Sequence, residues 1–336
     1  MPVVVTTGGW WGDEGKGKIV SYMALKDKIN VAVRVGSVNA GHTVVFNNRK
    51  YKLRLVPCAF VYNKCRLFIG PGANVNPEVF FSEIENMDVK DRVWVDYQSS
   101  IIEKEHIERD KGSELLAKKI GTTGQGVGPA VEDRVKRVAK MAREIPSLKP
   151  YLSDVTLEVN KAIARGDKVL LEGTQGFYLS LYHGTYPYVT SRDTSSASVC
   201  GEAGVPPTKI DDVLLVFKAY VTRVGGGPLP GELPEEEARK RGWVEIATVT
   251  GRMRRAAPFN YELARRAAIV NGATQLAITK IDVLFPECTG VKRFDKLSRR
   301  AVSFIKKIER EVKVPVKIIS TGPSTMDTVD RRVEAT

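Results

Sequence analysis

The chain has 336 residues, enough for one large domain or two ordinary ones, and its 43% hydrophobic and 27% charged residues are typical of a globular protein. No apolar run is long enough to span a bilayer, and the N-terminus lacks the basic segment and cleavage site of a signal peptide. Lys and Arg exceed Asp and Glu by 52 to 39, and this net charge of +13 favours anionic partners such as nucleotides.

Other partners and sites are less well supported by composition. The sequence has no RNA-recognition motif and no zinc-finger spacing, so we expect neither nucleic acid nor a membrane as partner. The four cysteines are scattered and there are only three histidines, which argues against a structural zinc site. We expect the cysteines to be buried free thiols in a cytoplasmic protein.

The predicted elements alternate between strands and helices along the chain. Runs of β-branched and apolar residues predict strands over 3–7, 30–36, 92–97, 211–225 and 275–282, and strands that run into a turn or loop over 51–57, 65–72, 168–176 and 314–324. Apolar periodicity predicts helices within 15–26, 76–87, 101–120, 156–166, 259–272 and 297–312. This order predicts an α/β fold with a mostly parallel central sheet, flanking helices and a core like that of the P-loop NTPases, in a single domain over residues 1–336. The segment "GTTGQGVGPA" at 121–130 holds too much glycine for a regular element and predicts a functional loop.

A phosphate-binding loop is predicted between the first strand and the first helix. In "GGWWGDEGKGKIV", Gly12, Gly17 and Lys18 have the spacing of such a loop, but Ile19 stands where a Walker loop needs a Ser or Thr for magnesium. Lys16 adds a second positive charge. Asp13 is unexpected beside phosphates, and it is a metal ligand, a general base or an ordinary turn residue.

Three further motifs follow strand ends or glycine turns. His42 in "NAGHT" is a candidate acid or phosphate ligand, although a lone histidine is more often structural. "TKID", at 279–282, is similar to the element by which GTPases bind guanine, since an ionised Asp accepts from both N1–H and the 2-amino group. "TVTGRMRR" carries three arginines suited to carboxylate or phosphate, or it is a basic surface loop.

Taken together, these motifs resemble those of the adenylosuccinate synthetase family. The matching segments are "WGDEGKGKIV", "NAGHTVV", "GTTGQGVGPAVED", "LEGTQG", "HGTYPYVTS", "KAYVTRVGGGPLPGEL", "TGRMRR", "TKID" and "STGP", in the family's order from end to end of the chain. The resemblance implies a cytoplasmic, homodimeric, magnesium-dependent ligase that joins L-aspartate to IMP with GTP, through a 6-phosphoryl-IMP intermediate, in the AMP branch of purine biosynthesis.

The resemblance also implies roles for individual residues. Asp13 matches the base that removes the N1 proton of IMP, His42 the acid that stabilises charge on the phosphoryl group, and Lys16 a catalytic phosphate ligand. The metal ligands would be Asp13 and Gly41. GTP would be bound by Gly12, Glu14, Gly15, Lys16, Gly17, Lys18, Gly41, His42, Thr43, Arg254, Lys280, Ile281, Asp282, Ser320, Thr321 and Gly322. IMP would be bound by Asp13, Lys16, Asn39, Ala40, Gly41, His42, Thr123, Gln175, Thr190, Arg252 and, from the neighbouring subunit, Arg137. Aspartate would be bound by Thr248, Val249, Thr250, Gly251, Arg252, Met253 and Arg254.

The chain departs from the family pattern in three respects. Trp10 stands where Gln is expected, and Gln125 stands where Arg is usual. The chain is also shorter than the common form between Arg137 and Gln175 and between Asp282 and Ser320, which we expect to remove peripheral elements and not chemistry. Two alternatives remain. A regulatory GTP-binding switch does not explain His42, the Gly-Thr-Thr loop or the arginine-rich segment, and a basic RNA-binding protein is favoured only by the net charge.

Overall fold

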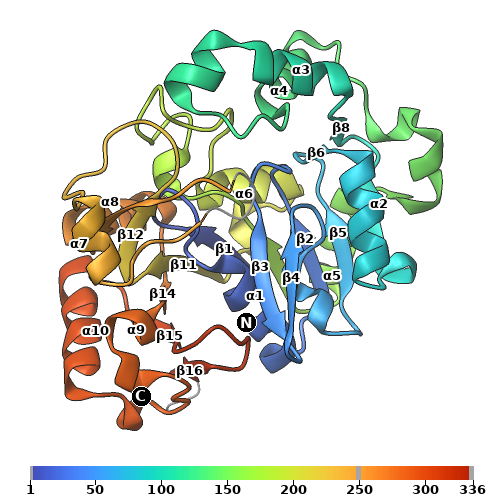
Figure 1. The fold of residues 1–336 in the computed structure, drawn as a ribbon. Coiled ribbons are helices and arrows are strands. Elements are labelled where there is room, and N and C mark those ends of the chain that lie inside the picture. Colours follow the sequence, from blue (N-terminus) through green and yellow to red (C-terminus); the bar gives the residue numbers. More distant parts are fainter. Residues whose placement is uncertain (1–2, 247–250, 333–336) are drawn as a thin grey trace.

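The computed structural model describes residues 3–246 and 251–332 of the chain (Figure 1). Its centre is a ten-stranded sheet in the order β16-β15-β14-β11-β1-β10-β2-β5-β7-β9. These strands are β1 (Val3–Gly8), β2 (Val31–Arg34), β5 (Arg66–Ile69), β7 (Val93–Asp96), β9 (Leu152–Ser153), β10 (Val169–Glu172), β11 (Asp212–Lys218), β14 (Gln275–Thr279), β15 (Val316–Ser320) and β16 (Thr328–Asp330). All neighbours in the sheet pair in parallel except β15 and β16, which confirms the predicted fold class.

Three two-stranded pairs lie outside the main sheet. They are β3 (His42–Phe46) with β4 (Arg49–Leu53), β6 (Asn74–Val75) with β8 (Ser100–Ile101), and β12 (Tyr220–Arg223) with β13 (Arg255–Pro258). The β3–β4 hairpin turns at Asn47 and Asn48, whose φ angles of 49° and 59° suit asparagine in a two-residue turn.

Helices cover both faces of the sheet. The α-helices are α1 (Lys16–Asp27), α2 (Pro77–Asn86), α3 (Lys104–Gly112), α4 (Val127–Lys136), α5 (Val155–Ala164), α6 (Ser196–Ala203), α7 (Glu235–Lys240), α8 (Tyr261–Asn271), α9 (Ile281–Leu284) and α10 (Arg299–Val312). Short 3₁₀ segments lie at Cys58–Val61, Lys90–Arg92, Ala142–Glu144, Pro146–Tyr151, Phe177–Leu179, Pro207–Lys209, Pro286–Cys288 and Phe294–Lys296, and a π-helix at Leu115–Ile120. Figure 1 shows α3 and α4 side by side beyond β6 and β8.

Local signals account for most helix ends. Asn76 caps α2 by accepting a hydrogen bond from the Val79 amide at 3.1 Å, as predicted, and Pro77 begins the helix. Gly272 ends α8 with a φ of 60°, a left-handed conformation that glycine adopts without strain.

Five element predictions were wrong in part. The strand predicted over 275–282 ends at Thr279, and α9 begins at Ile281. Residues 211–225 form two strands in different sheets, because the chain leaves the main sheet at Ala219. Helix α4 begins inside the glycine-rich segment, at Val127. The strand predicted over 51–57 ends at Leu53, and the helix predicted over 101–120 is divided into α3 and a π-helix.

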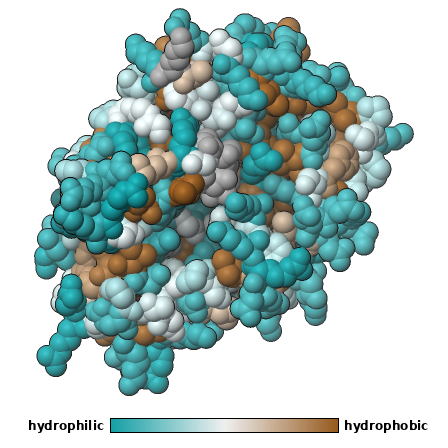
Figure 2. Space-filling view, in the orientation of Figure 1, coloured by the Kyte–Doolittle hydropathy of each residue, from teal (hydrophilic) through white to brown (hydrophobic). Residues whose placement is uncertain are grey.

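Alternation along β1 separates two core layers. Val4 belongs to the core cluster that includes residues of α1 and α2, whereas Val3 and Val5 belong to the cluster that includes residues of α5 and α6. Among the described residues no helix is long and apolar enough to cross a membrane. The face drawn in Figure 2 is largely hydrophilic, with hydrophobic side chains in scattered groups.

A further core cluster contains Trp10, the residue found where the family pattern has Gln. Its ring is fully buried and contacts Phe217 and Phe259 edge to face, with centroid distances of 4.7 and 5.1 Å. Its indole N–H donates to the Lys218 carbonyl at 3.1 Å. Trp10 therefore anchors the phosphate loop to the core, through contacts with β11 and with the residue Phe259 that precedes α8.

We expect Trp10→Ala to lower the free energy of unfolding by about 3–5 kcal/mol, because it leaves a cavity among aromatic rings. Denaturant titration followed by circular dichroism measures the change. Tyr182→Ala is the matched control, since the Tyr182 side chain is 76% exposed and its removal should change stability by less than about 0.5 kcal/mol. Equal losses in the two variants would contradict this account.

Candidate active site

The loop between β1 and α1 has the close backbone turns of a phosphate loop. Gly12, Asp13 and Gly15 have φ angles of 89°, 62° and 85°. A Cβ atom on Gly17 would lie 2.9 Å from Cβ of His42, so only glycine allows β3 to approach the start of α1 this closely. The loop therefore depends on its glycines at the points where the predicted motif has them.

Glu14 is turned into the protein and organises this loop. Its fully buried carboxylate accepts from the amides of Trp10 and Gly12 at 3.0 and 2.9 Å, and from Lys16 Nζ at 2.6 Å. Lys16 Nζ also donates to the Gln175 carbonyl. The second acidic residue of the loop thus fixes both the backbone and the lysine that follows it.

Asp13 projects instead to the other side, where its carboxylate lies 2.8 Å from Nε of Arg254. Burial raises the pKa of Asp13, and the charges of Arg254 and Lys218 oppose that rise only in part. A carboxylate with a raised pKa is a stronger base than an ordinary surface aspartate.

Lys18 connects α1 to the last turn of the sheet. Its Nζ donates to Ser320 Oγ at 2.6 Å, to the Gly322 carbonyl at 2.5 Å and to the Asp327 carbonyl at 2.7 Å. Burial lowers the pKa of Lys18 to about 7. Thr279 Oγ1 donates to the Glu14 carbonyl at 2.6 Å, so "TKID" and "STGP" both meet the phosphate loop.

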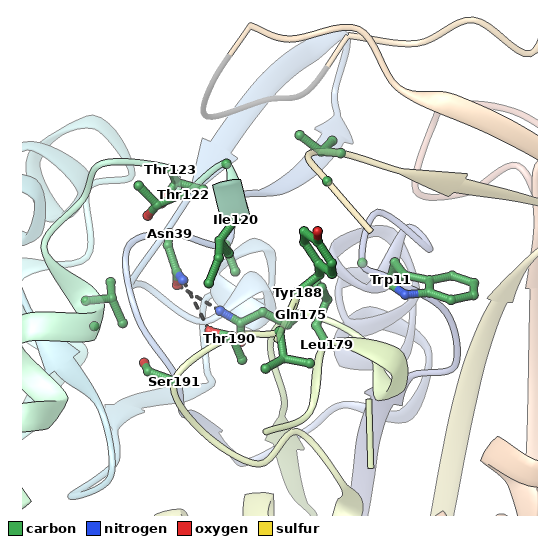
Figure 3. A pocket seen from close by; sticks show the side chains of 18 of the residues that line it. Trp11, Asn39, Ile120, Thr122, Thr123, Gln175, Leu179, Tyr188, Thr190 and Ser191 are labelled. Carbon is green, nitrogen blue, oxygen red and sulfur yellow. Dashed lines mark hydrogen bonds between the residues drawn. The ribbon is translucent and has the colours of Figure 1, made fainter. Parts of the chain in front are cut away.

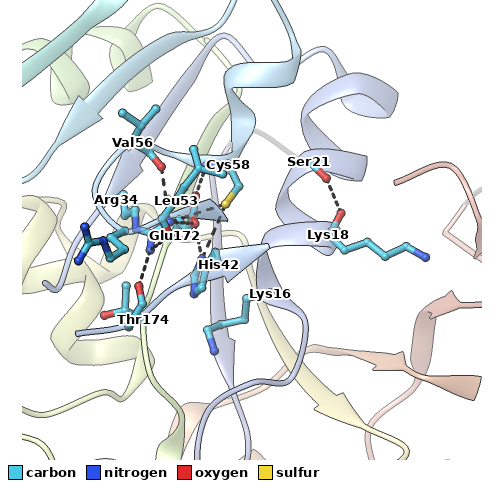
Figure 4. Close-up of polar contacts among 12 residues, drawn as sticks. Lys16, Lys18, Ser21, Arg34, His42, Leu53, Val56, Cys58, Glu172 and Thr174 are labelled. Carbon is cyan, nitrogen blue, oxygen red and sulfur yellow. Dashed lines mark hydrogen bonds and ion pairs between the residues drawn. The ribbon is translucent and has the colours of Figure 1, made fainter. Parts of the chain in front are cut away.

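His42, at the start of β3, lies in a buried polar cluster (Figure 4). Its Nδ1 is 2.6 Å from Glu172 Oε1, and the same oxygen accepts from Arg34 Nη1 at 2.9 Å. Glu172 Oε2 accepts from the Cys58 amide at 2.7 Å. Burial and the nearby Arg34 guanidinium lower the pKa of His42 to about 3, so the ring is neutral here.

The cluster holds a group of possible metal ligands that other contacts occupy. Ligand atoms of His42, Cys58 and Glu172 lie within 4.8 Å of one another. The Glu172 carboxylate is already shared between Arg34 and His42, and a cation would have to displace both. We therefore interpret this group as a hydrogen-bonded cluster and not as a metal centre.

Beside this cluster lies a cavity of about 400 Å³ (Figure 3). Asn39 Oδ1 accepts from Gln175 Nε2 at 2.8 Å, and Asn39 Nδ2 donates to Thr190 Oγ1 at 3.5 Å. The predicted site residues that line the cavity are Gly12, Asp13, Lys16, Asn39, Ala40, Gly41, His42, Thr123, Gln175, Thr190 and Arg252. Arg252 Nη2 donates to the carbonyls of Gly121 and Thr122, which closes one side of the cavity.

Other predicted site residues lie outside this cavity. Those in or packed around the phosphate loop and strand ends are Glu14, Gly15, Gly17, Lys18, Thr43, Arg254, Lys280, Ile281, Asp282, Ser320, Thr321 and Gly322. Arg137 is exposed at the end of α4, away from the cavity. Gly251 and Met253 are exposed, and Thr248, Val249 and Thr250 lie outside the described residues.

Glu245 has a central position that the sequence did not reveal. Its carboxylate accepts from Lys218 at 3.0 Å, from Tyr220 at 2.5 Å and from Arg254 Nη1, and it lies 3.6 Å from Lys280 Nζ. Burial would raise the pKa of Glu245, but Lys218, Lys280 and Arg254 hold it well below its usual value. Glu172 and Arg34 were missed likewise, although Glu172 lies in the recognised segment "LEGTQG".

Gln125 departs from the family pattern but has a defined partner. Its Oε1 accepts from Arg54 Nη1 at 3.1 Å. The contact ties the glycine-rich segment to the chain that follows β4, so this segment has a local anchor despite the missing arginine.

Comparisons with known proteins agree on one family. A family model described as adenylosuccinate synthetase matches residues 4–147 and 138–288. Curated relatives named adenylosuccinate synthetase are 55% identical in Archaeoglobus fulgidus and 52% identical in Pyrococcus horikoshii, each over 99% of both chains. These relatives have essentially the length of this chain, so its shortness is shared with them.

Solved structures show the same fold. A structure of the fully ligated adenylosuccinate synthetase from Plasmodium falciparum matches with a TM-score of 0.91 and 25% identity, over 99% of this chain and 100% of that one. A succinoaminodeoxyadenylate synthetase of cyanophage S-2L has a TM-score of 0.83 at 21% identity, over 98% and 95% of the two chains.

Proposed function

Because the chain belongs to the adenylosuccinate synthetase family, we propose how its described residues carry out that family's reaction. The protein is a ligase that joins L-aspartate to IMP with GTP, giving adenylosuccinate, GDP and phosphate by way of 6-phosphoryl-IMP. The observation that carries our assignment of roles is the convergence of Asp13, Lys16 and His42 on one cavity.

IMP occupies the cavity. Its volume of about 400 Å³ is within the range of small-molecule sites, and its walls combine apolar side chains with a few polar groups. The amides of Asn39 and Gln175 and the hydroxyls of Thr123 and Thr190 offer donors and acceptors to the nucleotide. Ala40 and Gly41 bring the backbone to the same wall.

GTP binds across the start of α1. The N-terminal amides of this helix and its glycine loop, Gly12 to Lys18, favour phosphate oxygens. Asp282 accepts from the guanine base, Lys280 and Ile281 flank it, and Ser320, Thr321 and Gly322 close over it. Lys18 supports this arrangement, because it already holds Ser320 and Gly322 beside the phosphate loop.

Asp13 acts as the base that takes the N1 proton of IMP, so that O6 becomes nucleophilic enough to attack the γ-phosphorus of GTP. The new O6–phosphorus bond forms as the bond to the GDP oxygen breaks, and the amine of aspartate then displaces phosphate from C6. His42 and Lys16 stabilise the charge on the transferred group. The neutral imidazole becomes an acid only when bound phosphate offsets the burial that lowers its pKa.

Aspartate is bound by the segment from Thr248 to Arg254. Arg252 lines the cavity and Arg254 contacts Asp13, which supports placing the aspartate carboxylates between the IMP and GTP sites. Arginine forks suit carboxylates in two-pronged geometry.

The residues present fit a magnesium ion. Asp13 and Gly41 both line the cavity, and a carboxylate and a backbone carbonyl are the hard oxygen donors that Mg²⁺ prefers. Glu14 is unsuited to this role because its oxygens are engaged inside the loop. A bound Mg²⁺ would neutralise phosphate charge, and Asp13 would hold it while facing IMP.

The active unit is a homodimer in which the partner subunit's Arg137 completes the IMP site. Arg137 is exposed in the single chain, and its neighbours Val135 and Val138 are 72% and 71% exposed, which supports a contact surface at this end of α4. The chain acts as one domain over residues 1–336. It acts in the cytoplasm, where nucleotide substrates are present and where its four free cysteines stay reduced.

We expect phosphate release from GTP only when IMP and aspartate are both present. A coupled assay that omits each substrate in turn measures this dependence, and replacing GTP by ATP should reduce kcat/KM about 10²-fold or more, because Asp282 would lose its donors. Hydrolysis of GTP at the same rate without IMP would instead support a regulatory GTP-binding switch.

Asp13→Asn should lower kcat by about 10²–10⁴-fold, because the amide cannot accept the N1 proton. Isothermal titration should show IMP affinity largely retained, since the side chain keeps its shape. Gln98→Glu, which exchanges an amide and a carboxylate of equal shape at an exposed residue that does not line the cavity, is the control. Near-normal turnover by Asp13→Asn would remove Asp13 as the base.

Mixing two inactive variants tests whether sites are shared. Asp13→Asn and Arg137→Ala subunits should be nearly inactive alone, but mixed dimers should regain about a quarter of wild-type activity, because half of the dimers would each contain one intact site. Asp13→Asn mixed with Asn39→Ala is the matched control, since both defects fall within one subunit's own site. Recovery in neither mixture would contradict the sharing of Arg137.

A further inference from the structure

Glu172 has contacts unlike those of an ordinary buried acid. It ends β10, its side chain is fully buried, and its two oxygens receive His42, Arg34 and the Cys58 amide at 2.6–2.9 Å (Figure 4). It does not line the cavity, whereas His42 does. Glu172 can therefore act on substrate only through His42.

The contacts of Glu172 decide which nitrogen of His42 is available. Arg34 is itself 2% exposed, and a buried guanidinium keeps its partner carboxylate ionised. An ionised carboxylate only accepts hydrogen bonds, so His42 Nδ1 must carry the proton between them. Burial alone would raise the pKa of Glu172, but Arg34, His42 and the Cys58 amide hold it low, in agreement with this geometry.

The other ring nitrogen is left for the reaction. His42 Nε2 is buried and has no hydrogen-bond partner among the described residues, and an unpaired buried nitrogen is costly unless a ligand completes it. The neighbouring Cys58 does not compete strongly with Glu172 for Nδ1 of His42, since its Sγ lies 3.8 Å from that nitrogen.

We propose that Glu172 is a positioning residue, which keeps one proton of His42 on Nδ1 and leaves Nε2 toward the phosphoryl group, to which it donates once the ring takes up a second proton. Arg34 keeps the Glu172 carboxylate ionised and in place, with a further anchor to the Ala40 carbonyl at 3.0 Å. The arrangement has the logic of a carboxylate that orients a catalytic imidazole. The proposal rests on the role of His42 given above.

The test uses Glu172→Gln in the full-length protein. Its amide can donate to the ring, so the tautomer is no longer fixed, and we expect kcat to fall by about 10²–10⁴-fold with KM for IMP and GTP changed less than about threefold. Nitrogen-15 NMR of the imidazoles is feasible because the chain has only three histidines. Wild type should show the Nδ1–H tautomer for His42, with the signal assigned by His42→Asn, and Glu172→Gln should show a mixture or the other tautomer.

Two further variants separate positioning from folding. Glu172→Gln leaves the Arg34 charge buried without a counter-ion, so the double variant Arg34→Met/Glu172→Gln removes both charges and should show the same loss of kcat. Asp96→Asn is the matched control, because Asp96 is a buried carboxylate that accepts from the Gln98 and Val155 amides away from the cavity. Its kcat should stay near wild type.

Several results would overturn the proposal. They are an Nε2–H tautomer in the wild-type protein, a folded Glu172→Gln protein with kcat within threefold of wild type, or a large loss of kcat with the Nδ1–H tautomer unchanged. Absence of the ligase reaction in wild type would contradict the proposed function instead, while the NMR comparison would still test the hold of Glu172 on His42.

Discussion

Buried cations need oxygen partners, and this requirement organises the site. Lys16, Lys18, Arg34, Lys218 and Arg254 are all less than 10% exposed. Each has an oxygen partner inside the protein. Glu14 pairs with Lys16, the turn after β15 accepts from Lys18, Glu172 pairs with Arg34, and Glu245 pairs with both Lys218 and Arg254. Because an unpaired buried charge costs several kcal/mol, a chain that concentrates cations for nucleotides must also supply internal oxygens to hold them. The buried carboxylates near the cavity are therefore explained by the need to pair these cations.

The same requirement explains the two acidic residues of the phosphate loop. Glu14 serves the fold, since its oxygens are used by loop amides and Lys16. Asp13, one position earlier, lines the cavity, and its carboxylate lies 2.8 Å from Nε of Arg254. Ile19 follows the same division: it is fully buried in the core beside β3, so the first turn of α1 serves packing where a Walker loop has its hydroxyl. Two neighbouring carboxylates therefore have different tasks because one faces inward and the other faces the cavity.

Much of the fold could be predicted because its signals are local. The glycine loop after β1, the Asn76 cap and the Gly272 stop each depend on a few adjacent residues. The break at Ala219 could not be predicted, since residues 213–221 form one run of apolar residues interrupted only by Lys218, and only pairing with β13 moves the second half to another sheet. Helix α4 was hidden because Gly126 and Gly128 suppress helix propensity, while Val127 and Ala130 gain burial that only the tertiary structure reveals. Most residues that line the cavity lie in the recognised motifs. Glu172 and Glu245 act through partners at least 114 and 9 residues away along the chain, which no short motif encodes.

The contacts also show that two parts of the site are held in different ways. The segments proposed to face guanine are hydrogen-bonded to the loop and first turn of α1, through Thr279 to Glu14 and through Ser320 to Lys18. These hydrogen bonds fix the distance between the proposed base site and the phosphate loop. A nucleotide must match that distance to bind, and little conformational entropy is lost when it does. The arginine-rich segment is held differently, because Arg254 and Arg252 reach across to Asp13 and to the Gly121 carbonyl, whereas Gly251 and Met253 between them are exposed. In the proposed assignment of roles, recognition of GTP is thus built into the sheet edge, whereas recognition of aspartate depends on long side chains, and the proposed base Asp13 lies where the two meet.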